Sequence, residues 1–99
     1  MEIVKNVDAG KVTFALKGRL DTVTAPQLES EVDACAPDAA SLEFDFSELD
    51  FLTSAGLRVL LKAQKAVNRN DGTMVIRNVN DVIMDVFDAT GFIDILTVE

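Results

Sequence analysis

The stretch that decides the fold is LEFDFSELDFLTSAGL, at residues 42–57. Over residues 42–46, apolar side chains alternate with carboxylates, which predicts a β-strand with one buried face. A short apolar connection follows, and the small residues 53–56 then open a helix that begins near Ser54. The stretch therefore predicts a half-buried strand that leads directly into a helix.

The same alternation of strand and helix extends to both sides of this stretch. Near the N-terminus, two β-prone runs flank Asp8-Ala9-Gly10, which is typical of a hairpin turn because glycine accepts a positive φ. Strands that alternate with helices favour parallel pairing, and the hairpin adds one antiparallel pair. We expect a single α/β domain over residues 1–99, in which helices pack on a small, mostly parallel mixed sheet. In chain order, the predicted elements are strands at 3–7 and 11–16, a helix at 24–35, a strand at 42–46, a helix at 54–70, a strand at 73–77, a helix between Asn80 and Gly91, and a short strand at 92–98.

Local signals mark the ends of the helices. Thr24 is the expected N-cap of the first helix, and Gln27, three residues later, completes a capping-box pattern. Asn80 is expected to cap the last helix and Gly91 to stop it. Residues 17–21 break the alternation of the second strand.

Composition excludes several classes of function. The chain has 9 basic and 17 acidic residues, a net charge of −8, one cysteine and no histidine. Histidine-activated nucleophiles and histidine-containing zinc sites are thereby excluded, and the acidic balance opposes a nucleic-acid partner. No apolar run is long enough to cross a membrane, and residues 1–5 lack the features of a signal peptide. We expect a cytoplasmic domain without metal or cofactor.

Ser54 has two readings. In the first, Thr53 or Ser54 only caps the helix, and Ala55 and Gly56 allow the helix to approach the sheet. In the second, the hydroxyl lies beside unpaired N–H groups at the positive end of the helix dipole, a place that tolerates a phosphate and suits a binding switch. The turn lacks the glycine spacing and lysine of a phosphate-binding loop, and no activating residue adjoins Ser54, so we expect no enzyme activity.

The helix at 54–70 contains four basic residues and no acidic one, whereas the rest of the chain has 5 basic and 17 acidic residues. These residues, Arg58, Lys62, Lys65 and Arg69, fall at helical spacing on one face. The face is either a solvated surface or a patch that attracts an acidic partner.

Asp21 and Thr24 follow a strand in the same way as Thr53 and Ser54 do. Because loops at the carboxyl ends of parallel strands gather at one edge of a sheet, Asp21 could lie near Ser54. Its alternative role is to bind the backbone of its own turn.

Three segments, residues 18–28, 46–57 and 87–92, together resemble the STAS family, the sulphate transporter and anti-sigma factor antagonist domains. The first is similar to the G-x-L-D-x-x-x-A-x-x-L segment of that family, the second to its central motif and the third to F-x-x-x-G-[LF]. The similarity covers almost the whole chain and is strongest to the stand-alone bacterial anti-sigma factor antagonists.

The resemblance implies a regulator of transcription that switches partners. An unmodified antagonist of this family binds an anti-sigma factor, often a serine kinase, and so frees a sigma factor. The kinase phosphorylates the serine that matches Ser54, and a cognate phosphatase restores it. The family commonly has Asp before that serine, where this chain has Thr53. The implied partner-binding residues are Asp21, Thr24, Thr53, Ser54, Ala55, Gly56, Arg58 and Lys62.

STAS-like domains also serve a second purpose, as accessory subunits of ABC systems that transport lipids. In that alternative, the start of the helix at Ser54 would dock on the ABC ATPase, and phosphorylation would play no part.

Overall fold

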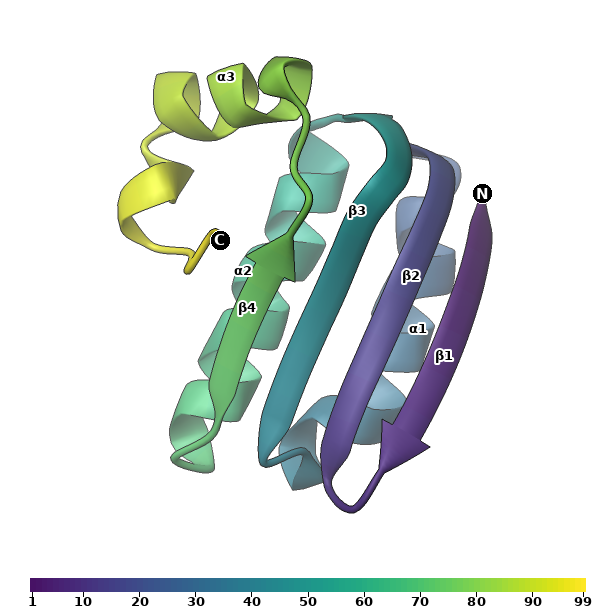
Figure 1. Cartoon of the computed structure of the whole chain (residues 1–99), viewed down its shortest axis with the longest axis vertical. Helices are drawn as coiled ribbons and strands as arrows, with labels where there is room; N and C mark the ends of the chain where they lie inside the picture. The colour runs from purple at the N-terminus through teal and green to yellow at the C-terminus, as the bar shows by residue number, and fades with distance from the viewer.

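The centre of the molecule is a four-stranded sheet in which the strands lie side by side in the order of the sequence (Figure 1). The computed structural model describes residues 1–99, except for the side chain of Pro37. The first two strands pair antiparallel and the other neighbours pair parallel, so the predicted mixed sheet is confirmed. The strands are β1 (Glu2–Asp8), β2 (Lys11–Leu20), β3 (Ser41–Leu52) and β4 (Thr73–Arg77).

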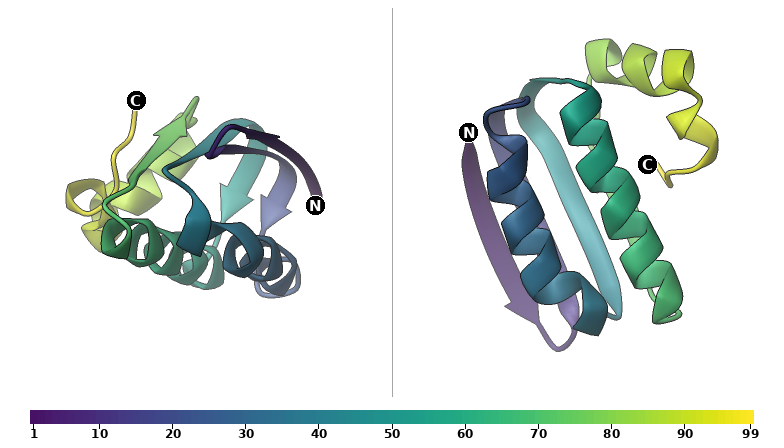
Figure 2. Two further views of the ribbon diagram at one scale, coloured as in Figure 1. Left: turned by 90° about the horizontal axis from the view of Figure 1, so that it is seen from below. Right: turned by 180° about the vertical axis from the view of Figure 1, so that it is seen from behind.

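Two helices, α1 (Ala25–Cys35) and α2 (Ser54–Arg69), cover the same face of the sheet (Figure 2). A third helix, α3 (Asp81–Thr90), lies beyond the carboxyl ends of the three parallel strands β2, β3 and β4 (Figure 1). Short 3₁₀ helices follow α1 at Ala36–Asp38 and α3 at Phe92–Asp94. Within the described chain, no helix is both long and apolar enough to cross a membrane.

The core lies between the sheet and the α1–α2 layer. Its centre is a row of aromatic rings on β2 and β3: the ring centroids of Phe14 and Phe44 are 5.6 Å apart, and those of Phe44 and Phe46 are 6.2 Å apart. Leu28 and Leu60 close the core from the two helices and are fully buried. Burial of each such side chain contributes about 1.5–3 kcal/mol, so this row fixes how the helices sit on the sheet.

β2 and β3 are longer than predicted because β-bulges interrupt their pairing. Ala15 pairs with Asp45 but Lys17 with Glu48, so β3 has one extra residue there, and a second shift follows beyond Gly18. A bulge shifts the alternation of side chains without ending the strand. The predicted ends at residues 16 and 46 were therefore wrong, and the sequence between 47 and 52 is strand rather than connection.

The predicted strand at residues 92–98 was also wrong. Gly91 has a φ of 79° and ends α3, and the chain then turns through the 3₁₀ helix. Val98 then forms an isolated parallel bridge with Ile76 of β4. The Ile76 N–H donates to Thr97 O at 2.9 Å, and the Glu99 N–H donates to Ile76 O at 2.9 Å. The C-terminal segment thus covers the free edge of β4 at one point.

Candidate functional site

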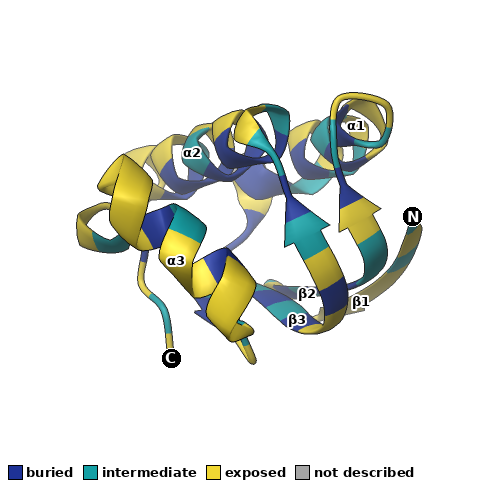
Figure 3. Ribbon diagram, turned by 90° about the horizontal axis from the view of Figure 1, so that it is seen from above, coloured by how far each residue is buried: buried dark blue, intermediate teal, exposed yellow. Residues whose placement is uncertain are grey.

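The loops that follow β2 and β3 lie side by side at one edge of the molecule (Figure 3), and the loop that follows β4 is at the same end of the sheet (Figure 1). The Thr53 N–H, between β3 and α2, donates to the Leu20 carbonyl at the end of β2, with an N···O distance of 3.0 Å. This bond joins the loop that contains Asp21 to the start of the helix that contains Ser54. The two strand-to-helix junctions are therefore neighbours, as predicted.

Gly56 lies in close contact with the end of β2. A Cβ atom at this position would lie 2.7 Å from Cγ and 2.9 Å from Cδ2 of Leu20, far inside the 3.5–4.0 Å of a normal carbon contact. Leu20 is fully buried and cannot swing away. The absence of a side chain at residue 56 therefore lets the first turn of α2 lie against the end of β2.

Ser54 is the first residue of α2 and is exposed to solvent. The first hydrogen bond within the helix runs from the Leu57 N–H to Thr53 O. The N–H groups of residues 54–56 therefore have no carbonyl partner within the helix. Ser54 thus lies beside unpaired donors at the positive end of the helix dipole. A phosphate on its hydroxyl would be in a favourable field and in contact with solvent.

Thr53 has the extended backbone of an N-cap residue, but its side chain does not cap α2. Its Oγ1 is buried and has no hydrogen-bond partner among the residues that the structure describes. The reading in which the hydroxyl of Thr53 caps the helix is therefore wrong.

Thr24 does not cap α1 in the predicted way either. Its backbone is helical (φ −94°, ψ −21°), and its side chain makes no cap bond to the helix. Instead, Thr24 Oγ1 accepts from the Asp21 N–H at 2.9 Å and lies 2.8 Å from the Arg19 carbonyl, which can accept its proton. The predicted capping box with Gln27 is likewise absent from the described hydrogen bonds. Thr24 closes the turn before α1 rather than the helix itself.

Asp21 is the other half of that turn. Its Oδ1 accepts from the N–H groups of Val23 and Thr24, each at 3.0 Å, so the alternative role predicted for Asp21 is confirmed. The bond from the Thr24 N–H, followed by that from Val23, lowers the pKa of the Asp21 carboxyl below its usual value. Asp21 is therefore an ionised residue that holds the loop beside Ser54 in a fixed shape.

A shallow groove of about 260 Å³ lies beside Ser54, between the first turns of α1 and α2. Its lining includes two of the predicted partner-binding residues, Ala55 and Arg58. Lys62 lies further along α2 and extends toward α1, where its Nζ is 3.0 Å from Asp33 Oδ1 and 3.6 Å from Glu29 Oε2.

Sequence reasoning missed part of this edge. Thr22 and Pro26 line the same groove, and Val23 is 85% exposed in the loop between them. The sequence signal for this part was Val23 itself, an apolar residue in a short loop that fits neither the helical nor the strand pattern around it. In the described part of the chain, no group of three or more acidic, cysteine or histidine side chains is placed to hold a metal ion.

Comparison with known proteins agrees with this arrangement. A family model described as the STAS domain matches residues 1–99. An anti-sigma-B factor antagonist of Staphylococcus aureus is 30% identical over 82% of this chain and 76% of its own length.

Solved structures show the same fold. An anti-sigma factor antagonist from Mycobacterium paratuberculosis has a TM-score of 0.86 at 23% identity, over 98% of this chain and 83% of that chain. The Bacillus cell fate determinant SpoIIAA in its phosphorylated form has a TM-score of 0.79 at 18% identity, over 99% of this chain and 91% of that chain. The match of the family model from end to end, together with the Staphylococcus relative, leads to one conclusion: this chain belongs to the STAS domain family.

Proposed function

We propose that this chain is an anti-sigma factor antagonist whose binding is switched by phosphorylation of Ser54. The single observation that carries the proposal is the place of Ser54: exposed, first in α2, and at the edge where two strand-to-helix junctions are joined. The Staphylococcus relative is named an anti-sigma factor antagonist, which supports the same function here. The bound protein is then an anti-sigma factor, and transcription is regulated indirectly.

The covalent step is a phosphoryl transfer from ATP. Ser54 Oγ attacks the γ-phosphorus, an O–P bond forms, the bond to the β-phosphate oxygen breaks, and ADP leaves while the hydroxyl proton is released. The anti-sigma factor itself acts as the kinase, and a cognate phosphatase hydrolyses the phosphoserine. Exposure of Ser54 is what both enzymes require, because each must place the Oγ atom in its own active site.

The phosphate changes binding without unfolding the domain. It adds a charge of about −1.5 to −2 at the N-terminus of α2, where the helix dipole and the unpaired N–H groups stabilise it. At a packed interface the same charge must be desolvated or displaced, which costs several kcal/mol. Since each 1.4 kcal/mol is a tenfold change in affinity, a switch of a hundredfold or more needs no refolding.

The other partner-binding residues act around Ser54 in two ways. Asp21, Thr24, Thr53 and Gly56 give the edge its shape, through the turn before α1 and through the close approach of α2 to β2. The second group contacts the partner directly and consists of Ser54 with Ala55, Arg58 and Lys62. The alternative function, docking on an ABC ATPase, uses the same edge, but the Staphylococcus relative is named an antagonist, which favours the first proposal.

The test is phosphorylation and binding with a candidate anti-sigma factor kinase. The protein and three variants, Ser54→Ala, Ser54→Asp and Ser30→Asp, are incubated with the kinase and ATP, and the modified residue is mapped by mass spectrometry. Ser30 is an exposed serine of α1 and provides the matched control. We expect label on Ser54 only and none on Ser54→Ala.

Binding is measured by calorimetry in the same series. Ser54→Asp should weaken binding at least tenfold, Ser30→Asp less than twofold, and phosphatase treatment should restore the affinity of the labelled protein. Label on another residue, or full binding by Ser54→Asp, would contradict the proposal.

A further inference from the structure

The outer face of α2 presents four cations in one line: Arg58, Lys62, Lys65 and Arg69. Their spacing is i, i+4, i+7 and i+11, which places them on one side of a helix over a length of about 16 Å. We call this line the α2 stripe. The helix contains no acidic residue, although the chain as a whole has a net charge of −8.

Among the described residues, one member of the α2 stripe has acidic partners. Lys62 is paired with Asp33 and Glu29 of α1. Within the described part of the chain, Arg58, Lys65 and Arg69 have no acidic partner. Like charges at i, i+4 destabilise a helix, so the free domain gains nothing from this arrangement.

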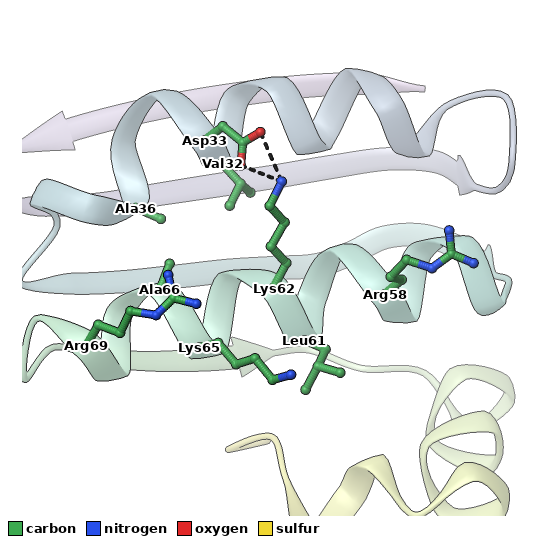
Figure 4. Close-up of a pocket in the computed structure, with 9 residues that line it drawn as sticks. All are labelled: Val32, Asp33, Ala36, Arg58, Leu61, Lys62, Lys65, Ala66 and Arg69. Carbon is green, nitrogen blue, oxygen red and sulfur yellow. Dashed lines mark hydrogen bonds and ion pairs between the residues drawn. The ribbon is translucent and has the colours of Figure 1, made fainter.

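The α2 stripe borders a groove of about 410 Å³ between α1 and α2 (Figure 4). Apolar side chains contribute to its walls: Val32 from α1, Ala36 from the 3₁₀ helix that follows it, and Leu61 and Ala66 from α2. Figure 4 shows Lys62 extending across to α1, whereas Lys65 points away from it. The surface therefore combines an apolar strip with unpaired cations on the same helix face.

We propose that this surface docks an acidic amphipathic helix of a partner protein. A helix with carboxylates at i, i+4, i+7 and i+11 matches the spacing of the α2 stripe, and its apolar side chains would contact Leu61 and Ala66. Pairing with such a helix removes the repulsion that the free domain bears.

The surroundings of the α2 stripe favour a narrow ligand over a broad one. Glu29 and Asp33 of α1 flank it directly, and the chain outside α2 has 17 acidic and 5 basic residues. A nucleic acid or an anionic membrane would contact these carboxylates as well, at a cost in repulsion. Of these two α1 carboxylates, Asp33 alone lines the groove, so a single docked helix meets less negative charge than a broad ligand does.

This docking surface shares Arg58 and Lys62 with the edge at Ser54, but its other two cations lie far from that edge. Lys65 and Arg69 lie 11 and 15 residues along α2 from Ser54, or about 16 and 22 Å. The Debye length at physiological salt is about 8 Å, so a charge on Ser54 is largely screened at both. Lys65 and Arg69 thus hold an acidic helix whether or not Ser54 carries a phosphate.

The test uses a fluorescent peptide of about 18 residues, long enough to form a helix, with glutamates at the matching spacing and leucine or alanine beside them. A scrambled peptide of the same composition is the control ligand. Binding to the full chain is measured by fluorescence anisotropy, and the contact surface is mapped by NMR shift changes. We expect saturable binding, shifts on α2 and at Val32 of α1, and affinity that falls as salt rises.

Two double variants separate the α2 stripe from general charge. Lys65→Glu/Arg69→Glu and the control Lys11→Glu/Lys17→Glu each change two cations, so each lowers the net charge by four, from −8 to −12. Lys11 and Lys17 alternate with buried residues of β2 and lie on the sheet face opposite the helices. We expect the first variant to lose at least about tenfold in affinity, which is 1.4 kcal/mol, and the control and Ser54→Asp less than twofold.

Several results would overturn this proposal. The control variant could lose as much peptide affinity as Lys65→Glu/Arg69→Glu, or the scrambled peptide could bind as tightly as the designed one. The NMR shift changes could fall outside α2. A DNA oligonucleotide or anionic vesicles could bind as tightly as the peptide, with the same dependence on the α2 stripe. A large loss in Ser54→Asp would show one surface instead of two. Thermal melting identifies any variant that fails to fold. Failure of phosphorylation at Ser54 would leave the peptide result intact, so the two proposals fail separately.

Discussion

Replacement of Gly56 by alanine sets helix propensity against packing at the functional edge. In the interior of a helix, alanine is favoured over glycine by about 1 kcal/mol. Against this, the new Cβ would lie 2.7 Å from Cγ and 2.9 Å from Cδ2 of Leu20, and 3.3 Å from its carbonyl oxygen. Normal carbon contacts need 3.5–4.0 Å, so helix and strand must separate by about 1 Å.

Such a separation is energetically costly, because Leu20 is fully buried and its carbonyl accepts a hydrogen bond from the Thr53 N–H. Overpacking of this kind costs about 1–3 kcal/mol, and the contact here is near the upper end. After the gain in propensity, we expect Gly56→Ala to lose about 1–2 kcal/mol of unfolding free energy. For a domain of this length, that is a fall in Tm of about 5–15 °C.

Urea unfolding followed by far-UV circular dichroism is the appropriate assay, since the chain has no tryptophan or tyrosine to report by fluorescence. A double-mutant cycle with Leu20→Ala tests the cause. Removal of the Leu20 side chain leaves room for the new methyl group, so Gly56→Ala should cost about 1–2 kcal/mol less in that background. Equal or higher stability of Gly56→Ala, or a cycle without coupling, would refute the steric reasoning.

Three further variants test other parts of the structure. Asn80→Ala removes the bond that Asn80 Oδ1 accepts from the Ile83 N–H at 2.8 Å and the bond to Leu49 O at 3.0 Å, and should cost about 1–2 kcal/mol in urea unfolding. Asp21→Asn tests pH dependence. The pKa of Asp21 is lowered in the folded state, so its contribution is present above the unfolded pKa of about 3.9 and is lost as pH falls through the folded value. Asn keeps an acceptor oxygen but does not titrate, so urea midpoints of this variant should fall less below pH 4 than those of the wild type. Lys65→Glu creates opposite-charge pairs with Lys62 and Arg69 and should raise stability by about 0.2–0.5 kcal/mol, a gain that disappears in high salt; a loss of stability would contradict the repulsion assigned to the α2 stripe.

Features that depend on neighbouring residues in the sequence were predicted well. Asn80 caps α3 and Gly91 ends it in the left-handed region, because both roles use backbone groups within one turn. The turn at residues 70–72 lies between α2 and β4, as its Asn-Asp-Gly sequence indicates.

Features that depend on pairing across the fold were not predictable in the same way. The bulges of β3 exist because its extra residues have no partner on β2, and a single strand sequence does not contain that information. Thr24 has the sequence of a cap, but Asp21 and the Arg19 carbonyl compete for its hydroxyl.

In the candidate site, too, local features were predictable from the sequence and features that depend on distant residues were not. The sequence places a hydroxyl at the start of a helix, because the pattern of small residues is local. It does not indicate that Lys62 is neutralised by α1 while Lys65 is not, because Asp33 is 29 residues away along the chain. The difference between a solvated basic face and a patch with unpaired cations appears only when α1 and α2 are placed side by side.

The two proposed surfaces overlap on α2 at Arg58 and Lys62, and Arg58 is the one nearer to Ser54. It lines both the groove beside Ser54 and the groove of the α2 stripe. One helical turn, about 6 Å, separates it from Ser54, which is within the Debye length, so a phosphate on Ser54 acts on Arg58 but not on Lys65 or Arg69. A phosphoserine four residues before an arginine also forms a favourable pair on a helix. Phosphorylation therefore acts in two ways at the Ser54 edge: it adds negative charge, and it pairs with Arg58, which is then no longer available to the partner. Lys65 and Arg69, at the far end of the helix, keep their positive charge free.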